Sequence, residues 1–143
     1  MINAQQIDSS GDILWPAEGV TINETFTSSA SDKGIVSDGD GGAYIVWRDH
    51  RNMGTTDWDL YGQRLNGLGD RLWETGGTPI VVTPEDQGSF DIMSAGPGGV
   101  FVAWADNRGD SLDIYAHKVF DAGLIFVDGF ETGDPAWWDR IIP

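Results

Sequence analysis

The sequence predicts an all-β fold made of short antiparallel strands, and three observations lead to this prediction. Glycine accounts for 20 of the 143 residues and aromatic residues for 11%, a combination typical of strands joined by tight turns. One sequence pattern recurs along the chain, which indicates a repeat architecture. No segment has a convincing helical period, and the only stretch that suggests a helical turn is 135–140.

The repeat has two full copies. Residues 35–51 (IVSDGDGGAYIVWRDHR) align with residues 92–108 (IMSAGPGGVFVAWADNR) at a constant shift of 57 positions. Further along, residues 59–61 align with residues 113–115 at a shift of 54, which implies a loop three residues shorter in the second copy. Both copies carry the motif Trp-x-Asp-x-Arg, formed by Trp47, Asp49 and Arg51 and by Trp104, Asp106 and Arg108.

A third, partial copy lies at the N-terminus, where residues 5–19 align with residues 63–77 at a shift of 58. We therefore expect one repeat domain over residues 1–125, followed by a short tail. Its parts are a half unit (1–25), a first unit (26–85) and a second unit (86–125), and the tail is 126–143.

Each full unit is predicted to form four strands separated by turn residues. The expected strands of the first unit are 34–37, 43–48, 59–65 and 71–73, the last running on towards 80–83. Those of the second unit are 90–94, 100–105, 113–120 and 124–127. The second strands of both units, 43–48 and 100–105, are apolar on both faces, which predicts that both are fully buried.

Four-stranded antiparallel units of this kind predict β-propeller-type blades, because such a sheet must stack on its neighbours to bury both faces. About two and a half units are too few to close a ring, which usually takes about 4–8 blades. Three arrangements remain open: a piece of a longer propeller, a ring closed by several copies of the chain, or two units stacked as an open sandwich. The segment Gln5–Trp15 is also a candidate for the fourth strand of the last unit.

The repeat resembles one found in large exported bacterial proteins that are similar to β-propellers. Its units combine a Gly-Gly turn, Trp-x-Asp-x-Arg, Asp-Ile-Tyr-Ala-Gln-Arg-Leu and Gly-x-x-Leu-Trp. The likeness is carried here by GGAYIVWRDHR (41–51) and DLYGQRLNGLGDRLW (59–73), and it extends over residues 4–121. The second unit departs from the pattern, since His117 and Lys118 replace Gln-Arg and no Gly-x-x-Leu-Trp follows. The resemblance implies a propeller-like fold, but most of these proteins have no assigned function.

The tail (LIFVDGFETGDPAWWDRIIP, from residue 124) resembles a second pattern, Phe-x-Asp-Gly-Phe-Glu-x-Gly-Asp followed by Trp. That pattern occurs at the extreme C-terminus of many exported proteins of proteobacteria. The resemblance implies that Pro143 lies near the natural end and that the protein is extracellular or on the cell surface. The N-terminus has no basic-then-apolar stretch, so we expect any export signal to lie outside this chain.

Composition argues against several classes of function. The net charge is −15, from 23 acidic and 8 basic residues, and this argues against a nucleic-acid partner because phosphate binding needs a basic surface. The sequence contains no run of 18 apolar residues, so no membrane span is predicted. The chain has no cysteine, which excludes disulfides and thiolate metal sites.

The two Trp-x-Asp-x-Arg motifs (residues 47–51 and 104–108) are the most site-like feature, and they have two interpretations. As ligand-binding residues, the Trp would stack on a neutral sugar while Asp and Arg form hydrogen bonds. As a structural joint, Trp would fill the space between sheets, Asp would cap the turn after the second strand, and Arg would pair with a carboxylate. Occurrence in every unit favours the structural interpretation.

Asp38 and Asp40 are candidates for a calcium site, because they stand in an Asp-rich loop and calcium takes several oxygen ligands. The matching loop of the second unit, residues 95–99, has no Asp, which favours a simple turn. No catalytic residues are predicted, because neither His belongs to a nucleophile motif and no phosphate-binding loop is present.

We therefore expect a non-catalytic extracellular module that binds a glycan or a protein or serves as a scaffold, without a cofactor apart from possible calcium. Two alternatives stay open. The chain is a purely architectural segment of a larger or homo-oligomeric propeller, or it is a vestigial propeller of the glycoside hydrolase type.

Overall fold

The described part of the chain is all-β and its sheets are antiparallel, as the sequence predicts. A computed structural model describes residues 1–24, 30–96, 98–107, 111–120 and, for the backbone alone, 125–128. Within these residues the strands are β1 (Asn3–Ala4), β2 (Val20–Thr21), β3 (Ala30–Ser37), β4 (Ala43–Asp49), β5 (Asp59–Leu65), β6 (Thr78–Val81), β7 (Gln87–Ser94), β8 (Gly99–Asp106), β9 (Asp113–Phe120) and β10 (Ile125–Asp128). The suggested helical turn at 135–140 lies outside the described residues.

The two full units form one four-stranded sheet each, with neighbouring strands consecutive in sequence. Sheet one has the order β3-β4-β5-β6 and sheet two the order β7-β8-β9-β10. The predicted strands 59–65 and 113–120 agree with β5 and β9 at both ends. β3 and β7 begin earlier than predicted, because their first residues pair with the ends of β4 and β8.

The predicted strand at 71–73 is wrong. Arg71 forms only an isolated bridge with Leu65, and the fourth strand begins at Thr78. The cause is a buried amide on β5: the side chain of Gln63 donates to the carbonyl of Glu74 (2.8 Å) and accepts from the N–H of Trp73 (2.9 Å). These bonds satisfy the backbone of the segment without a strand ladder, so the chain leaves the sheet and returns after a loop.

The N-terminal half unit repeats β5 and β6 in detail. In the pair β1–β2, Asn3 is opposite Thr21, as Tyr61 is opposite Pro79 in sheet one, a shift of 58 on both strands. The amide of Gln5 donates to the carbonyl of Pro16 (2.7 Å), reproducing the role of Gln63. Residues 1–24 are therefore the third and fourth strands of a unit, as the sequence alignment indicates.

The prediction that Gln5–Trp15 completes the last unit is wrong. Sheet two has its own fourth strand, β10, which pairs with β9. The N-terminal segment packs on sheet one instead, where the indole N–H of Trp15 donates to the carbonyl of Gly67 (3.2 Å). Trp15 is buried there, in a cluster with Ile45 and Trp47, so its aromatic surface is removed from water without sheet two.

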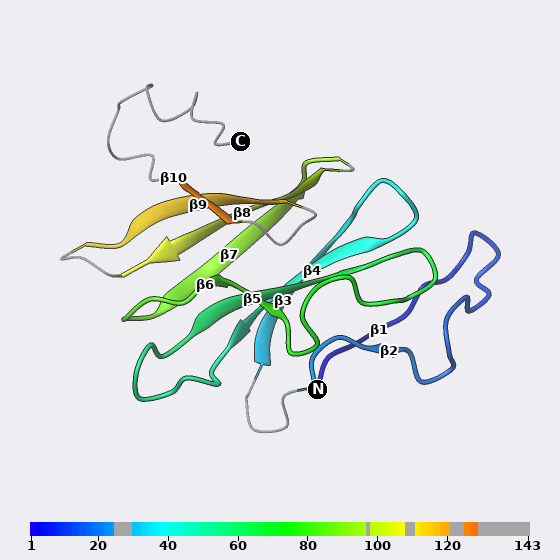
Figure 1. Cartoon of the computed structure of the whole chain (residues 1–143), viewed down its shortest axis with the longest axis horizontal. Helices are drawn as coiled ribbons and strands as arrows, with labels where there is room; N and C mark the ends of the chain where they lie inside the picture. Colours follow the sequence, from blue (N-terminus) through cyan, green and yellow to red (C-terminus); the bar gives the residue numbers. More distant parts are fainter. Residues whose placement is uncertain (25–29, 97, 108–110, 121–124, 129–143) are drawn as a thin grey trace.

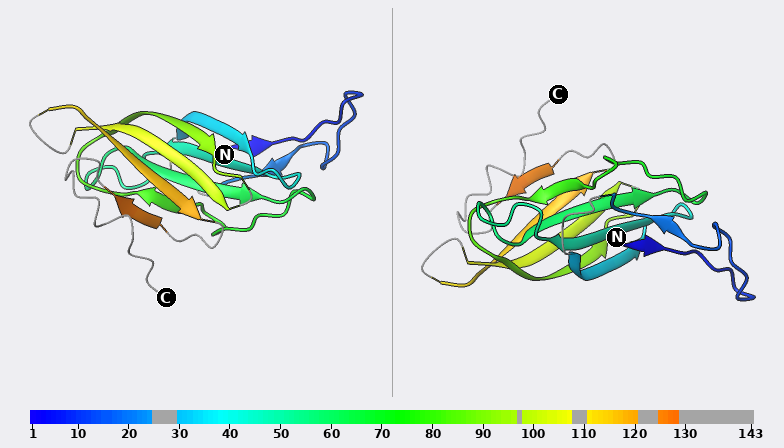
Figure 2. Two further views of the ribbon diagram at one scale, coloured as in Figure 1. Left: turned by 90° about the horizontal axis from the view of Figure 1, so that it is seen from above. Right: turned by 90° about the horizontal axis from the view of Figure 1, so that it is seen from below.

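The layers stack in the order β1–β2, sheet one, sheet two, with sheet one in the middle (Figure 1). The strands of the two four-stranded sheets run in roughly the same direction when seen from above or below (Figure 2).

Two separate apolar cores hold the stack together. The core between the N-terminal pair and sheet one is formed by Ile2, Trp15, Ile22, Ile45, Trp47, Tyr61 and Leu65. The core between the two sheets is formed by Tyr44, Val46, Leu60, Ile80, Val81, Val100, Val102, Trp104 and Val119. The described part of the chain is an open stack and closes no ring.

An arginine fastens sheet two to sheet one at one edge. Arg48 on β4 donates to the carbonyl of Gln87 (2.9 Å) and forms an ion pair with Asp86 (2.6 Å). The N–H of Gln87 in turn donates to the carbonyl of Trp58, which precedes β5 (2.9 Å). These bonds set the position at which β7 enters sheet two.

Candidate functional site

The motif Trp47-x-Asp49-x-Arg51 lies at the end of β4, inside the stack. Trp47 and Asp49 are fully buried. The indole N–H of Trp47 donates to Asp49 Oδ2 (2.8 Å), and Arg51 Nη2 donates to the same oxygen (2.7 Å). Arg51 also donates to the carbonyl of Gly76 in the β5–β6 loop (2.7 Å). The motif thus links the end of β4 to a neighbouring loop.

The second motif repeats this arrangement at the end of β8. Trp104 and Asp106 are buried, and the indole N–H donates to Asp106 Oδ2 at the same 2.8 Å. Trp104 packs in the core between the sheets, with its ring stacked near Tyr115 (centroids 5.9 Å apart). Arg108 lies outside the described residues. The Trp–Asp bond is therefore common to both units, and the arginine contact is described in the first unit alone.

Two carboxylates face each other across β4 and β5, since Asp49 and Asp59 are register partners, as Asp106 and Asp113 are in sheet two. Asp59 Oδ2 accepts from Asn52 (2.8 Å) and from the hydroxyl of Thr56 (2.9 Å). The guanidinium of Arg51 lies 3.7 Å from the ring centroid of Tyr61. Sequence reasoning assigned no role to Asn52 or Tyr61; the repetition of Tyr61 as Tyr115 was the available signal.

The two carboxylates differ in their electrostatic surroundings. Burial alone would raise the pKa of Asp49, but hydrogen bonds from Arg51 and Trp47 outweigh it and hold that pKa below its ordinary value. Burial raises the pKa of Asp59 above its ordinary value, because its bonds from Asn52 and Thr56 only partly compensate. Asp49 is thus a paired anion, whereas Asp59 is a carboxylate for which burial favours the neutral form.

This arrangement suits a joint better than a binding site. A sugar stacks on an aromatic face that is open to solvent, and the rings of Trp47 and Trp104 are covered in this structure. Asp49 Oδ2 already accepts two hydrogen bonds, and Oδ1 accepts a third from the N–H of Arg51 (2.9 Å).

The loop of the calcium hypothesis is a turn built around Asp38. Asp38 Oδ1 accepts from the N–H groups of Asp40 and Gly42 (both 2.8 Å), and Oδ2 forms an ion pair with Arg64 (2.8 Å). Burial opposes ionisation, but the backbone bonds and Arg64 lower the pKa of Asp38. Among the described residues, no three His, Asp or Glu side chains come together as a metal site.

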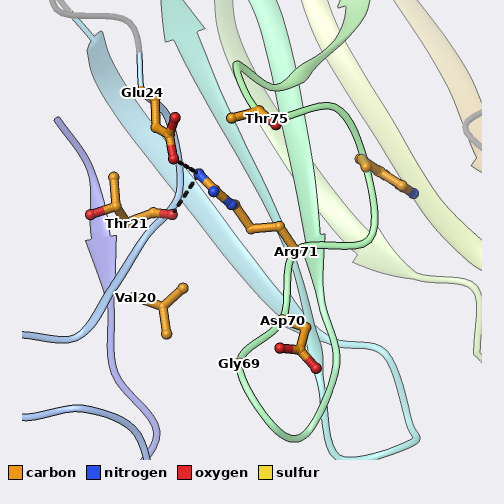
Figure 3. Close-up of a pocket in the computed structure, with 8 residues that line it drawn as sticks. Val20, Thr21, Glu24, Gly69, Asp70, Arg71 and Thr75 are labelled. Atoms are coloured by element: carbon orange, nitrogen blue, oxygen red, sulfur yellow. Dashed lines mark hydrogen bonds and ion pairs between the residues drawn. The ribbon is translucent and has the colours of Figure 1, made fainter.

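An open pocket of about 440 Å³ lies between the N-terminal pair and the β5–β6 loop (Figure 3). Arg71 reaches across it to Glu24, with Nη1 and Oε1 2.6 Å apart. Its lining is mostly polar and is formed by Val20, Thr21, Glu24, Gly69, Asp70, Arg71, Trp73 and Thr75. Sequence reasoning did not find this pocket, because it lies between two units.

Neither a protein-family model, nor a curated protein, nor a solved structure matches this chain. None of the described residues form a helix long and apolar enough to cross a membrane. Function is therefore inferred from the residues and contacts above.

Proposed function

We propose that this chain is a non-catalytic module of stacked β-propeller-type sheets that acts as a scaffold and assembles with other proteins. The observation that supports this most is the use of the Trp-x-Asp motif. In both units its Trp and Asp are buried and bonded to each other at 2.8 Å, so the most site-like residues hold the fold together. A motif that recurs once in each four-stranded sheet and lies inside the stack is what a repeated joint requires.

The propeller-type architecture is supported by the sheets themselves. Each unit is a meander of four antiparallel strands, and the units pack face to face through apolar side chains. The N-terminal pair reproduces the outer half of such a unit in the same register. These are features of β-propeller blades, here arranged as an open stack.

The location outside the cell and the absence of catalysis belong to the same proposal. The likeness of the repeat and of the tail to exported bacterial proteins supports an extracellular or surface location. The opposed carboxylates Asp49 and Asp59 lie inside the sheet, and Asp49 is engaged by Arg51, which supports a structural role rather than a hydrolytic one.

The scaffold proposal is tested by Asp106→Asn, with the exposed Asp12→Asn as matched control. If Asp106 serves a joint, its amide variant lowers the midpoint of urea denaturation clearly, because a buried acceptor of the Trp104 N–H is altered. The control leaves the midpoint unchanged. An Asp106→Asn protein as stable as the wild type would contradict the joint role and favour a ligand site.

A second candidate function is glycan binding in the pocket between the N-terminal pair and the β5–β6 loop. Its mixture of a cation, carboxylates and hydroxyl groups suits the hydroxyl groups of a neutral sugar. Titration with a panel of oligosaccharides, followed by NMR of the backbone amides, tests it. Saturable shifts centred on residues 69–75 that disappear in Arg71→Ala would support this function, and no shift with any sugar would refute it.

A further inference from the structure

The outer face of sheet two, here called the back face, is apolar and uncovered in the described part of the chain. The register of β7, β8 and β9 places on it Asp91, Met93, Phe101, Ala103, Ala105, Ile114, Ala116 and Lys118. Met93 is 63% exposed, Phe101 39% and Ile114 66%. Large apolar side chains gathered on one sheet face, around a strip of alanines, indicate an interaction surface.

The back face corresponds to a surface that is an interface within this chain. At the repeat shifts, Met93, Phe101 and Ile114 occupy the positions of Val36, Tyr44 and Leu60 on sheet one. Tyr44 and Leu60 are fully buried against sheet two, and Val36 packs beside them. The back face of sheet two is thus equivalent to the face of sheet one that sheet two covers.

A further unit of the same kind does not fit there in the same way. Sheet two sits closely on Gly34, where an added Cβ would be 2.9 Å from Ile92 and 3.2 Å from Phe90. The position of Gly34 is taken on the back face by Asp91, an exposed residue with a charged side chain. A strand docked as β7 docks on β3 would collide with this side chain and bury its charge, which is costly without a partner. The back face therefore calls for an occupant that offers a cation to Asp91.

The back face itself carries that cation. Lys118 lies on β9, on the opposite side of β8 from Asp91, and its Nζ is 5.5 Å from the ring centroid of Phe101. A two-fold axis between two back faces, parallel to the strands, places β7 of one copy over β9 of the other. Asp91 is level with Ala116, two residues from Lys118. Two residues of a strand span about 7 Å, a distance that a lysine side chain covers.

We propose that the back face binds the back face of a second copy of this chain, forming a two-fold symmetric dimer. Met93, Phe101 and Ile114 form the apolar contact, and Asp91 pairs with the partner's Lys118 twice, once on each side of the axis. This proposal rests on the scaffold function, to which it adds a specific partner, and isologous contacts of this type are the commonest in soluble oligomers.

The first experiment measures absolute mass by light scattering after size exclusion, over a series of concentrations. The wild type is expected at twice the 15.5 kDa monomer mass. Ile114→Asp is expected at the monomer mass with an unchanged circular dichroism spectrum, because it places a charge in the apolar contact. The matched control is Leu68→Asp, which changes an 81% exposed leucine in the β5–β6 turn and is expected to leave the dimer intact.

The second experiment reverses the proposed charge pair. Asp91→Lys and Lys118→Asp, each alone, are expected to raise the dimer dissociation constant at least about tenfold, because each opposes like charges at two places. The double variant is expected to restore most of the affinity. This recovery distinguishes the proposed geometry from any dimer in which the two residues do not meet.

Three results would overturn the proposal. They are a wild type that stays monomeric at every concentration, a dimer that Ile114→Asp leaves intact, and a mass above the dimer. A monomeric wild type whose melting temperature falls in Ile114→Asp would mean that Ile114 stabilises the chain itself and not a dimer. None of these results bears on the urea midpoint of Asp106→Asn, so failure of the dimer and failure of the scaffold function are separable.

Discussion

Replacement of Asp49 by Asn tests the joint most directly, because it changes one buried charge and keeps the shape of the side chain. Asp49 accepts three hydrogen bonds, from the indole of Trp47 and from the backbone and guanidinium of Arg51. Asn presents one acceptor oxygen and one NH₂ group, so at least one of these donors loses its partner. The ion pair between the guanidinium of Arg51 and the carboxylate of Asp49 is also lost.

The expected loss follows from these contacts. A hydrogen bond to a charged group contributes about 1.5–3 kcal/mol, and breaking a fully buried ion pair costs about 3–5 kcal/mol. The side chain of Arg51 is 16% exposed, so water compensates part of this cost. We expect Asp49→Asn to lower the free energy of unfolding by about 2–3 kcal/mol. For a chain of this size that corresponds to a melting temperature lower by about 8 °C.

The loss should depend on pH in a definite direction. The pKa of Asp49 is lower in the folded protein than its ordinary value. At every pH above that ordinary pKa, the ionised carboxylate therefore stabilises the fold in full. This contribution is lost as the pH falls through the lowered pKa. The difference between wild type and Asp49→Asn is therefore full at neutral pH and closes under acid conditions.

Urea denaturation followed by tryptophan fluorescence, at neutral pH and at several acid pH values, measures both effects. The reasoning is refuted if Asp49→Asn costs less than about 1 kcal/mol at neutral pH, or if the difference persists unchanged in acid. Either result would mean that the ion pair with Arg51 does not hold β4 to the β5–β6 loop.

Three further predictions concern other parts of the stack. Asp59→Asn should be at least as stable as the wild type at neutral pH, because burial raises the pKa of Asp59 and the neutral Asn avoids the cost of a buried charge. The wild type gains stability from a neutral Asp59 at low pH and loses it as the pH rises through the raised pKa. Urea midpoints at pH 7 and pH 4 should therefore show that the advantage of Asp59→Asn over the wild type shrinks towards acid. Gly77→Ala should cost about 2–4 kcal/mol in urea denaturation, because the residue has a φ of 90° and an added Cβ would lie 2.5 Å from the ring of Trp47; a neutral effect would contradict this packing. Trp15→Ala should cost about 3–5 kcal/mol, checked by calorimetry, and a smaller loss than about 1 kcal/mol would mean that the N-terminal pair is not packed on sheet one.

Much of the fold could be predicted from the sequence because the strand and turn patterns of one unit occur again in the other. The apolar runs at 43–48 and 100–105 predicted strands, and the structure places β4 and β8 there. The prediction of burial on both faces is confirmed for β4 and wrong for β8, where Phe101 on the outer face is 39% exposed. The alignment of 5–19 with 63–77 likewise indicated the half unit, and the register of β1–β2 agrees with it. Identity at fixed spacing predicted local structure well, since equivalent residues make equivalent local hydrogen bonds.

What the sequence could not predict depends on contacts between residues that the local pattern does not bring together. The segment 71–73 reads as a strand, and only the buried amide of Gln63 shows why it is a loop. The location of the N-terminal pair is set by which sheet face is free to cover Trp15, which is not a local property. The same holds for the pocket beside Arg71, whose two walls come from different units.

The separation of the two apolar cores has a consequence for how such chains change during evolution. Each layer depends on the layers directly beside it, so the free energy of the stack is approximately a sum over neighbouring pairs. Loss of an outer layer disturbs a single joint and leaves the other intact, whereas loss of sheet one would disturb both. The stack can therefore lose an outer layer while each remaining layer keeps its own set of bonds.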